Sequence, residues 1–399
     1  MQSTTGGLID AYIAYTQNHE STLRIRKWSI ISVLAALLER RVWLPRGYYI
    51  LYPNLYVFII GRSGFVKKST STAIAVNLLR EFDKIRIMSE RLTARSLIDQ
   101  LASSGKKFLY AEKHVSQSPV FAYASELSVF LHEVFGSVTE LLTTFYDCQP
   151  NDSSKPWTHT THGEGAIKIY GPCLNILGAS TKSWLKKCIP QSEIEGGFTS
   201  RIMFVVEENL PDKLVSWPEL SLDDESMKAK ILQDMRRMFS LVGEMKVDPA
   251  AKVLFDKWYQ YHMKEVLPYN QDERMIGYMS RKGDSILKLA TIHRCSIDDT
   301  LFMIPEDIEW ALNEIDDLEP DWRLAFDRAP KSISLTNEVY KSIKERKKIE
   351  CKRLMQYFCR YNSLQDVESA IEDLAGMEQI LRFRDSSGIE FLAIPGYNI

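Results

Sequence analysis

Residues 55–79, LYVFIIGRSGFVKKSTSTAIAVNLL, constrain the fold more than any other stretch of the chain. An apolar run ends at Gly61, a turn rich in Gly, Ser and Lys follows, and a helical pattern begins near Ser69. A strand that passes through a glycine turn into a helix directs backbone N–H groups and the helix dipole at one point, which favours an anion there. The stretch therefore predicts a phosphate-binding turn inside an α/β fold.

The spacing of this turn departs from the usual phosphate-binding pattern G-x-x-x-x-G-K-[ST]. Counted from Gly61, the second glycine position holds Val66 and the lysine position holds Lys67. Read one residue longer, as G-x-x-G-x-x-x-K-S-T, the pattern places Lys68 directly before Ser69. An ordinary basic turn between a strand and a helix is the alternative, and the spacing alone does not decide between the two.

The surrounding sequence supports an α/β core at 50–206. Short β-rich runs (YVFIIG, VFAYAS, CLNILGAS and RIMFVVEE) alternate with helical segments. Apolar strands that alternate with helices indicate a largely parallel sheet covered on both faces.

Regions on both sides of this core predict further domains. Residues 1–49 carry apolar positions at helical spacing and predict a lead-in of two helices. A surface connection rich in Pro and acidic residues at 207–225 precedes an all-helical stretch at 226–326, so 207–330 is expected to form a helical lid with a linker. Residues 331–399 read as three helices and a β-hairpin that turns at 385–388, which is the pattern of a winged-helix domain.

The compartment follows from the cysteines and the apolar runs. The six cysteines form no C-x-x-C pair, which disfavours a zinc site or a disulfide framework and favours a reducing compartment. The N-terminus has no signal-peptide pattern, and no apolar run reaches the roughly 20 residues that span a bilayer. We therefore expect a soluble protein of the cytoplasm (the host cytoplasm if it is viral) without a membrane partner.

Several stretches, in order, resemble the P-loop ATPases of phage, plasmid and other mobile-element replication proteins, long catalogued as a domain of unknown function. This family is related to replicative helicases and primase-helicases. The stretches, which cover roughly 25–325, are YPNLYVFIIGRSG, KKST, SERLTARSLIDQLAS, FAYASELSVFL, LTTFYDC, LNILGASTKSWL, GGFTSRIMFVV and GYMSRKGDSILKLATI. The resemblance implies an AAA+ or RecA-like P-loop NTPase core that uses ATP and Mg²⁺.

The resemblance also implies roles for the turn itself. Family members with the longer loop place the phosphate-binding lysine immediately before the hydroxyl residue, which implies Lys68 rather than Lys67 and makes Ser69 the Mg²⁺ ligand. The nucleotide-binding residues implied in this way are Gly61, Arg62, Ser63, Gly64, Phe65, Val66, Lys67, Lys68, Ser69 and Thr70.

ATP hydrolysis needs a carboxylate that orients water, usually at the end of a neighbouring strand. Glu126 follows the apolar run VFAYAS and is the candidate. Ser125 stands where such a glutamate is often preceded by an acidic residue, so Asp147 is considered as a substitute Mg²⁺ ligand. A helix N-cap at Ser125-Glu126 is the alternative interpretation.

Three further residues complete the expected nucleotide site, two of them catalytic (Ser180 and Arg201) and one nucleotide-binding (Arg281). By the resemblance, Ser180 at a strand end is a sensor of the γ-phosphate, although strand ends often carry Ser for turn reasons. Arg201 stands where related ATPases project an arginine finger into the neighbouring subunit, the alternative being a salt-bridged surface arginine. A finger that acts on the neighbour requires a homo-oligomeric ring, usually a hexamer. Arg281 opens a lid helix and is expected to contact the nucleotide of its own chain.

Two regions are candidates for DNA binding. The polar segment 149–171 carries Lys155, Trp157 and Lys168, and loops from this part of ring translocases line the channel for single-stranded DNA. A solvated surface loop is the alternative.

The second region is 341–360, which contains eight Lys or Arg residues and two Glu residues and therefore has a net charge of +6. Lys347 and Lys348, with Arg382 on the wing, are expected to contact the phosphates of duplex DNA. The segment NSLQDVESAIEDLAG, which takes the place of the recognition helix, is acidic and argues against sequence-specific reading. A protein-interaction role fits the region equally well.

Together these features predict an oligomeric ATP-dependent DNA motor, a replicative-helicase-like ATPase of a mobile element. The sequence shows no primase site, so priming would need a separate primase. An ATP-dependent initiator or loader without processive unwinding is one alternative, and an inactive P-loop scaffold is another.

Overall fold

Parallel strands rich in Val, Ile, Leu and Phe form the central sheet of the larger of two compact units, residues 1–326 and 327–399. The strand order is β10 (Ile202–Glu207), β3 (Tyr56–Gly61), β9 (Pro172–Ser180), β6 (Lys113–Ala124) and β4 (Ile87–Met88), with β5 (Lys106–Tyr110) antiparallel to β6. Every residue of β3, β9 and β10 is buried, because both faces of the sheet are covered. The expected mixed α/β core with a parallel sheet is confirmed.

The structure is a computed structural model. It describes residues 7–88, 92–130, 137–150, 152–161, 165–189, 197–211, 213–215, 217, 219, 221–269, 273–326, 331–359, 364–385 and 388–396. Within these residues no helix is long and apolar enough to cross a membrane.

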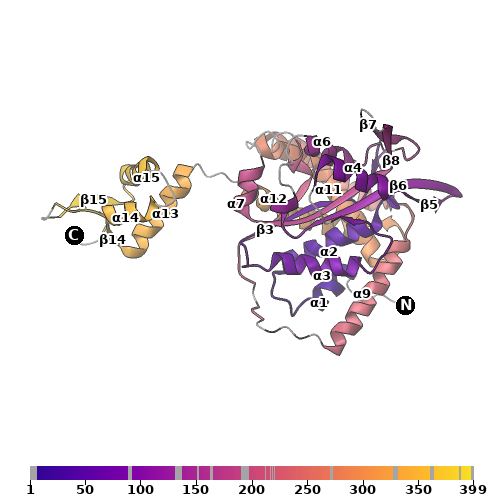
Figure 1. The fold of residues 1–399 in the computed structure, drawn as a ribbon, viewed down its shortest axis with the longest axis horizontal. Helices are drawn as coiled ribbons and strands as arrows, with labels where there is room; N and C mark the ends of the chain where they lie inside the picture. Colours follow the sequence, from indigo (N-terminus) through magenta and orange to yellow (C-terminus); the bar gives the residue numbers. More distant parts are fainter. Residues whose placement is uncertain are drawn as a thin grey trace. The chain divides into compact units, whose positions relative to one another are not determined.

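Helices cover both faces of the sheet (Figure 1). On one face, α2 (Leu23–Leu38) and α3 (Lys68–Leu79) pack against Val57 and Ile59 of β3. On the other face, α4 (Ala94–Ser103) and α6 (Ser137–Tyr146) pack in the cluster that holds Phe58 and Ile60. Successive β3 side chains point to opposite faces, so one apolar run supplies both cores.

The regions expected as lead-in and lid belong to the same compact unit as the sheet. Their helices are α1 (Leu8–Tyr15), α9 (Leu222–Ser240), α10 (Pro249–Tyr261), α11 (Glu273–Ile297) and α12 (Pro305–Phe326). The stretch 226–326 was expected to be all-helical, but it also contains three short strands. Strand β11 (Gly243–Glu244) pairs with β1 (Val42–Pro45), β1 also pairs with β2 (Ile50–Leu51), and β12 (Lys246–Val247) pairs with β13 (Phe302–Met303).

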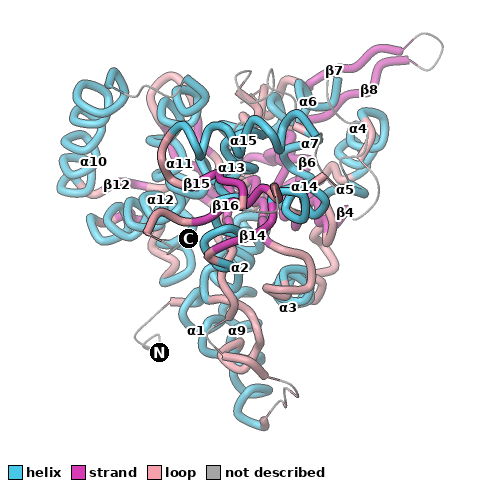
Figure 2. The backbone as a smooth tube through the Cα atoms, turned by 90° about the vertical axis from the view of Figure 1, so that its left-hand side faces the viewer, coloured by secondary structure: helices cyan, strands magenta, loops and turns pink. Residues whose placement is uncertain are grey.

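The segment expected as a polar loop at 149–171 contains an antiparallel hairpin, β7 (Pro156–Thr161) and β8 (Gly165–Tyr170), which extends from the body of the unit (Figure 2). Short helical elements complete the unit: α5 (Leu127–Phe130), α7 (Lys182–Cys188), a 3₁₀ turn at Thr199–Arg201, a π turn at His262–Val266 and a 3₁₀ turn at Leu267–Tyr269.

The C-terminal unit contains α13 (Lys331–Arg346), β14 (Lys348–Glu350), α14 (Cys351–Phe358), α15 (Leu364–Gly376), β15 (Leu381–Arg384) and β16 (Glu390–Ala393). Its sheet is antiparallel, in the order β14-β16-β15, so the expected terminal hairpin is present. Gly388 donates to the Asp385 carbonyl at 3.0 Å and has φ of +77°, a conformation that glycine adopts without strain. Ser386 and Ser387 lie outside the described residues.

Candidate active site

The glycine-lysine turn lies at the carboxyl end of β3, between the ends of β9 and β10. Gly61 is opposite Glu207 of β10, and a Cβ atom on Gly61 would lie 2.7 Å from the Glu207 carbonyl oxygen and 2.8 Å from Val66. Only glycine fits there. Gly64 and Lys67 have φ of +71° and +50°, and these left-handed residues turn the chain so that α3 begins at Lys68. The extra residue of the long loop is thus absorbed around Val66, which is fully buried.

Lys68 lies inside this turn and Lys67 lies outside it. The Lys68 side chain is buried, with 7% of the residue exposed, and its Nζ donates to the carbonyls of Gly61 at 2.8 Å and Arg62 at 3.0 Å. Burial lowers the pKa of Lys68, and the negative charge of Glu126 partly opposes that shift. Lys67 is exposed, 3.7 Å from the Glu20 carboxylate. An ammonium has three hydrogens, so a donor remains on Lys68 for an anion at the turn.

The other loop residues divide by burial. Phe65 is half-buried under the Arg62 guanidinium, which lies 5.8 Å from the centre of its ring. The remaining side chains and the glycine at the apex face solvent: Arg62, Ser63, Gly64, Ser69 and Thr70.

Polar side chains from two further strand ends meet the turn at the same edge of the sheet. Ser69 donates through its Oγ to the Ser125 carbonyl at 3.0 Å, and Ser180 donates to Glu126 Oε1 at 3.4 Å. Carboxyl ends of neighbouring parallel strands are where α/β proteins bind ligands. The N–H of Ser128 also lies 3.5 Å from Glu126, so the capping interpretation is present only as a long contact.

This edge suits a magnesium nucleotide. Mg²⁺ keeps several waters and takes one or two carboxylates together with substrate phosphates. The Ser69 hydroxyl and the Glu126 carboxylate are oxygen ligands of that kind, on elements joined by the Ser69–Ser125 hydrogen bond. These residues would hold the ion together with the phosphates.

Arg201 lies at the opposite edge of the sheet. It ends the 3₁₀ turn before β10, whose first residue, Ile202, is opposite Tyr56, the first residue of β3. At about 3.3 Å per residue, the six residues of β3 separate the two edges by roughly 17 Å. Arg201 is 5% exposed, with Nη2 2.6 Å from Asp147 Oδ2 and Nη1 2.7 Å from the Gly197 carbonyl.

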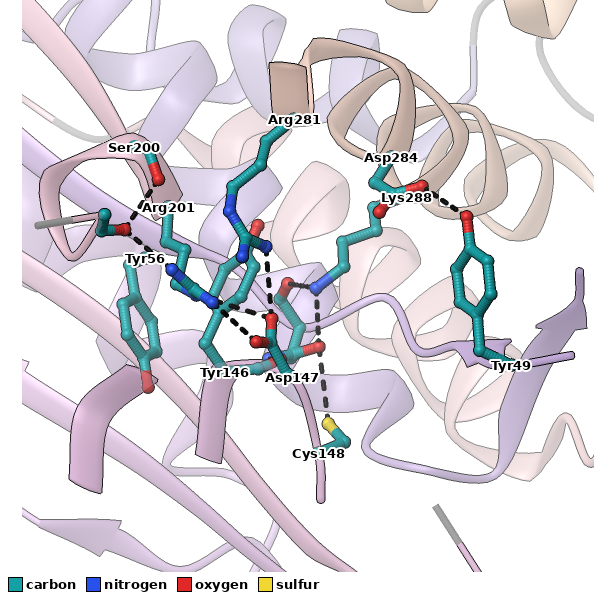
Figure 3. A network of polar contacts seen from close by, with 12 residues as sticks. Tyr49, Tyr56, Tyr146, Asp147, Cys148, Ser200, Arg201, Arg281, Asp284 and Lys288 are labelled. Atoms are coloured by element: carbon teal, nitrogen blue, oxygen red, sulfur yellow. Dashed lines mark hydrogen bonds and ion pairs between the residues drawn. The ribbon is translucent and has the colours of Figure 1, made fainter. Parts of the chain in front are cut away.

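This placement separates two of the expected nucleotide-site residues from the turn. Asp147 was considered as a Mg²⁺ ligand beside Ser69, and Arg281 as a contact of the nucleotide in the same chain. Instead, the Asp147 carboxylate accepts from Arg201 and, at 3.3 Å, from Nη1 of Arg281 (Figure 3). Asp147 is held at the amino edge because Asn54, which precedes β3, donates to the carbonyl of the neighbouring Tyr146 at 2.8 Å.

The amino edge also holds a cavity of about 210 Å³ that the sequence did not indicate. Lys288 lines it, with Nζ 2.9 Å from Asn54 Oδ1 and 3.7 Å from the centre of the Tyr146 ring. The Tyr49 hydroxyl donates to Asp284 at 3.1 Å on the same wall (Figure 3). A signal for this wall exists in the sequence: polar residues at 281, 284, 285 and 288 follow the i, i+3, i+4, i+7 spacing of one helix face.

The expected DNA contacts of the hairpin β7–β8 separate into two kinds. Lys155 and Lys168 are exposed. Trp157 is half-buried, with its ring edge-on to Phe145 at 5.2 Å and stacked on His159 at 5.8 Å. The indole therefore packs within the unit through part of its surface.

In the C-terminal unit, Lys347 is exposed, whereas the Lys348 ammonium lies 4.3 Å from the centre of the Phe391 ring. Arg382 pairs with both oxygens of Glu390, at 2.9 and 3.1 Å. This pair raises the pKa of Arg382 and lowers the pKa of Glu390. Glu390 therefore competes with a phosphate for the Nε and Nη2 donors of Arg382.

Comparison with known proteins adds little to this geometry. No family model matches the sequence, and no curated protein matches it. A full-length MCM homolog from Methanopyrus kandleri is a similar solved structure, with 13% sequence identity and a TM-score of 0.42. The match covers 78% of this chain and 59% of the homolog, so this chain spans less than two thirds of that protein. A similarity of this size supports no statement about function.

Proposed function

We propose that the chain is an ATPase that binds the ATP phosphates in the turn 61–70. The observation that carries this proposal is the convergence of three strand ends. The Lys68 ammonium lies inside the glycine turn after β3, and Glu126 and Ser180 contact each other at the ends of β6 and β9.

Each residue has a role that follows from its position. Lys68 and the start of α3 stabilise negative charge on the phosphates. Ser69 and Glu126 would hold the Mg²⁺ that accompanies ATP, and the ion would supply positive charge against the phosphates. Glu126 orients the attacking water, and Ser180 positions the Glu126 carboxylate at 3.4 Å.

Arg201 acts on the ATP of a neighbouring subunit. A side chain roughly 17 Å from the turn of its own chain cannot reach that nucleotide, since an extended arginine spans less than half of that distance. Arg281 contacts the same Asp147 carboxylate and belongs to the same edge. A ring of subunits, six in number, would bring this edge against the turn of the next copy.

The ATPase drives a DNA motor of the replicative-helicase kind, encoded by a mobile element. Exposed Lys155, directly before β7, and exposed Lys168, on β8, would contact single-stranded DNA in the channel of the ring. The three helices and the antiparallel sheet of the C-terminal unit support the proposal that residues 331–399 are a winged-helix domain. An initiator or loader that remodels DNA without unwinding it is the second candidate, because ATP turnover and DNA binding suit both.

The first experiment measures ATP turnover with and without single-stranded DNA in wild type, Lys68→Ala and Lys67→Ala. We expect Lys68→Ala to lose at least about 100-fold in turnover, because it removes a charge that faces the phosphates. Lys67→Ala is the matched control and should stay within about twofold, since its side chain faces solvent. The reverse result would assign the phosphate to Lys67, and no turnover in wild type would leave a scaffold.

A second experiment separates the motor from the loader. Strand displacement on a forked duplex by the wild-type chain, in the presence of ATP, is expected for the motor. DNA-stimulated turnover without displacement would favour the initiator or loader.

A further inference from the structure

The C-terminal unit carries a groove of about 740 Å³ between the end of α13, β14, α14 and β16. The side chains that give it its chemistry are Arg346, Lys348, Arg353, Tyr357 and Phe391. Cations and aromatic rings thus line the same depression, and Glu350 is the acidic residue among its lining.

The cationic side chains of the groove make only weak or local interactions with other groups of the unit. Arg346 donates to the carbonyl and hydroxyl of Ser342, one turn earlier in its own helix, at 3.1 and 2.6 Å. The Arg353 side chain is 79% exposed and 3.4 Å from Glu350, an i,i+3 contact that is worth little in water. Lys348 lies against the Phe391 ring. A polyanion can therefore engage these side chains without breaking a buried ion pair.

Tyr357 supplies a surface for a flat partner. Large aromatic side chains are mostly buried in folded domains, but Tyr357 is 57% exposed. Its ring is edge-on to the Phe358 ring, with 5.1 Å between the two ring centres. Aromatic rings beside phosphate-binding cations are the means by which proteins hold unpaired bases, since every base has a face that stacks.

The charge of helix α15 favours single-stranded over duplex nucleic acid as the ligand of this unit. Its exposed residues include Asp366, Glu368, Glu372 and Asp373, and α15 contains no Lys or Arg. A helix with this charge is repelled by the phosphates that line a major groove. The acidic face and the basic, aromatic groove belong to different elements of the unit, so the groove can bind nucleic acid that α15 would reject.

We infer that this groove binds single-stranded nucleic acid, with phosphates on Arg346 and Arg353 and a base stacked on Tyr357. The inference rests on the C-terminal unit alone and needs neither ATP binding nor a ring. It differs from duplex binding through Lys347, Lys348 and Arg382, because the ligand is unpaired and Arg382 keeps its partner Glu390.

The test measures binding of the full-length chain to a fluorescent oligothymidylate and to a duplex of equal length, by anisotropy without nucleotide. Tyr357→Ala should weaken single-strand binding about tenfold, and Tyr357→Phe should keep it, because the ring and not the hydroxyl stacks. Arg346→Gln and Arg353→Gln should each weaken it several-fold and reduce the slope of log affinity against log salt by about 0.7.

Lys352→Gln is the matched control. It removes one charge from the same helix, α14, but Lys352 lines a separate groove with Met355, Cys359 and Leu364. We expect affinity within about twofold of wild type. An equal loss in Lys352→Gln and Arg353→Gln, or tighter binding of the duplex, would overturn the inference. Loss in the arginine variants with Tyr357→Ala unchanged would do so too, because it would leave phosphate contacts without a stacked base.

A crosslink locates the strand within the full chain, where Lys155 and Lys168 are also exposed. An oligothymidylate that carries iodouracil should crosslink to the peptide containing Tyr357 after irradiation. Crosslinks confined to residues 1–326 would overturn the inference. ATP turnover without DNA should be the same in all these variants, so a failure of this test and a failure of the proposed ATPase are distinguishable.

Discussion

The two edges of the central sheet differ in how their charged side chains are paired. At the carboxyl edge, Lys68 donates only to backbone carbonyls among the described residues, and the contact between Ser180 and Glu126 is 3.4 Å. At the amino edge, Arg201 and Asp147 are 2.6 Å apart, and Arg281 adds a second guanidinium. Short charge-assisted bonds are about twice as strong as neutral ones, so the amino edge is held by its own side chains.

Under the proposed ATPase function, the carboxyl edge binds the nucleotide of its own chain. Loosely held polar groups around a glycine turn gain their strongest partner from a ligand, so changes there should alter turnover more than folding. The ion pairs of the amino edge stabilise the fold, and in the proposed ring Arg201 also acts on the ATP of the neighbouring subunit. Substitutions there should therefore affect both stability and the partner subunit.

The largest effect is expected from Arg201→Ala. Loss of an arginine finger reduces turnover by about 10³-fold or more. Because Arg201 is roughly 17 Å from the turn of its own chain, ATP binding by the variant should be unchanged. Turnover and the affinity for a fluorescent ATP analogue are the two measurements.

A mixture of two inactive variants tests whether the two edges meet between subunits. Arg201→Ala chains mixed with Lys68→Ala chains should regain part of the turnover that each lacks, since one intact edge of each kind can meet in a mixed ring. Mixed rings that form without regained turnover would contradict action on the neighbour. Arg201→Lys keeps the charge but not the two-pronged geometry and should remain impaired.

The next largest effect is expected from Glu126→Gln. Removing a carboxylate that orients water reduces turnover by about 10² to 10⁴-fold. Lys68, Ser69 and the glycine turn remain, so ATP binding should be weakened far less than turnover. Glu140→Gln is a control, because Glu140 is an exposed carboxylate on α6. A loss of ATP affinity equal to the loss of turnover would move Glu126 from chemistry to binding.

The sequence predicted the carboxyl edge better than the amino edge, for a physical reason. Gly61, Lys68 and Ser69 belong to one continuous stretch, and the strand ends that carry Glu126 and Ser180 are recognisable apolar runs. Parallel strands then bring their ends together without further information.

The amino edge could not be predicted in the same way. Asp147 follows a helix, Arg281 lies on a distant one, and their meeting depends on how α6 and α11 pack. A carboxylate near a nucleotide motif was therefore assigned to the metal, although it pairs with Arg201. The hairpin β7–β8 was missed because β7, PWTHTT, carries one large apolar residue, Trp157, and the alternation of Ile167 and Ile169 around Lys168 in β8 is short.

A smaller effect, on stability, is expected from Asp147→Asn. The substitution leaves the buried Arg201 guanidinium without its carboxylate and should reduce the free energy of unfolding by about 1–3 kcal/mol. Denaturant unfolding of the larger unit measures it. Asp99→Asn is the control, since Asp99 pairs with Arg95 on the surface, where the two side chains are half exposed, and should change stability by less than about 1 kcal/mol. Equal stabilities of the two variants would remove the distinction between the edges.

The smallest effect is expected from Ser180→Ala at the carboxyl edge. Its 3.4 Å contact with Glu126 is long for a hydroxyl donor, so its loss should reduce turnover about three- to tenfold with stability nearly unchanged. Thr181→Ala is the adjacent control. The Thr181 hydroxyl accepts from the N–H of Trp184 and caps α7, so its loss should cost about 1 kcal/mol of stability and leave turnover unchanged. If Ser180→Ala instead lowers stability while turnover is kept, Ser180 ends its strand as a turn residue and has no part in positioning Glu126.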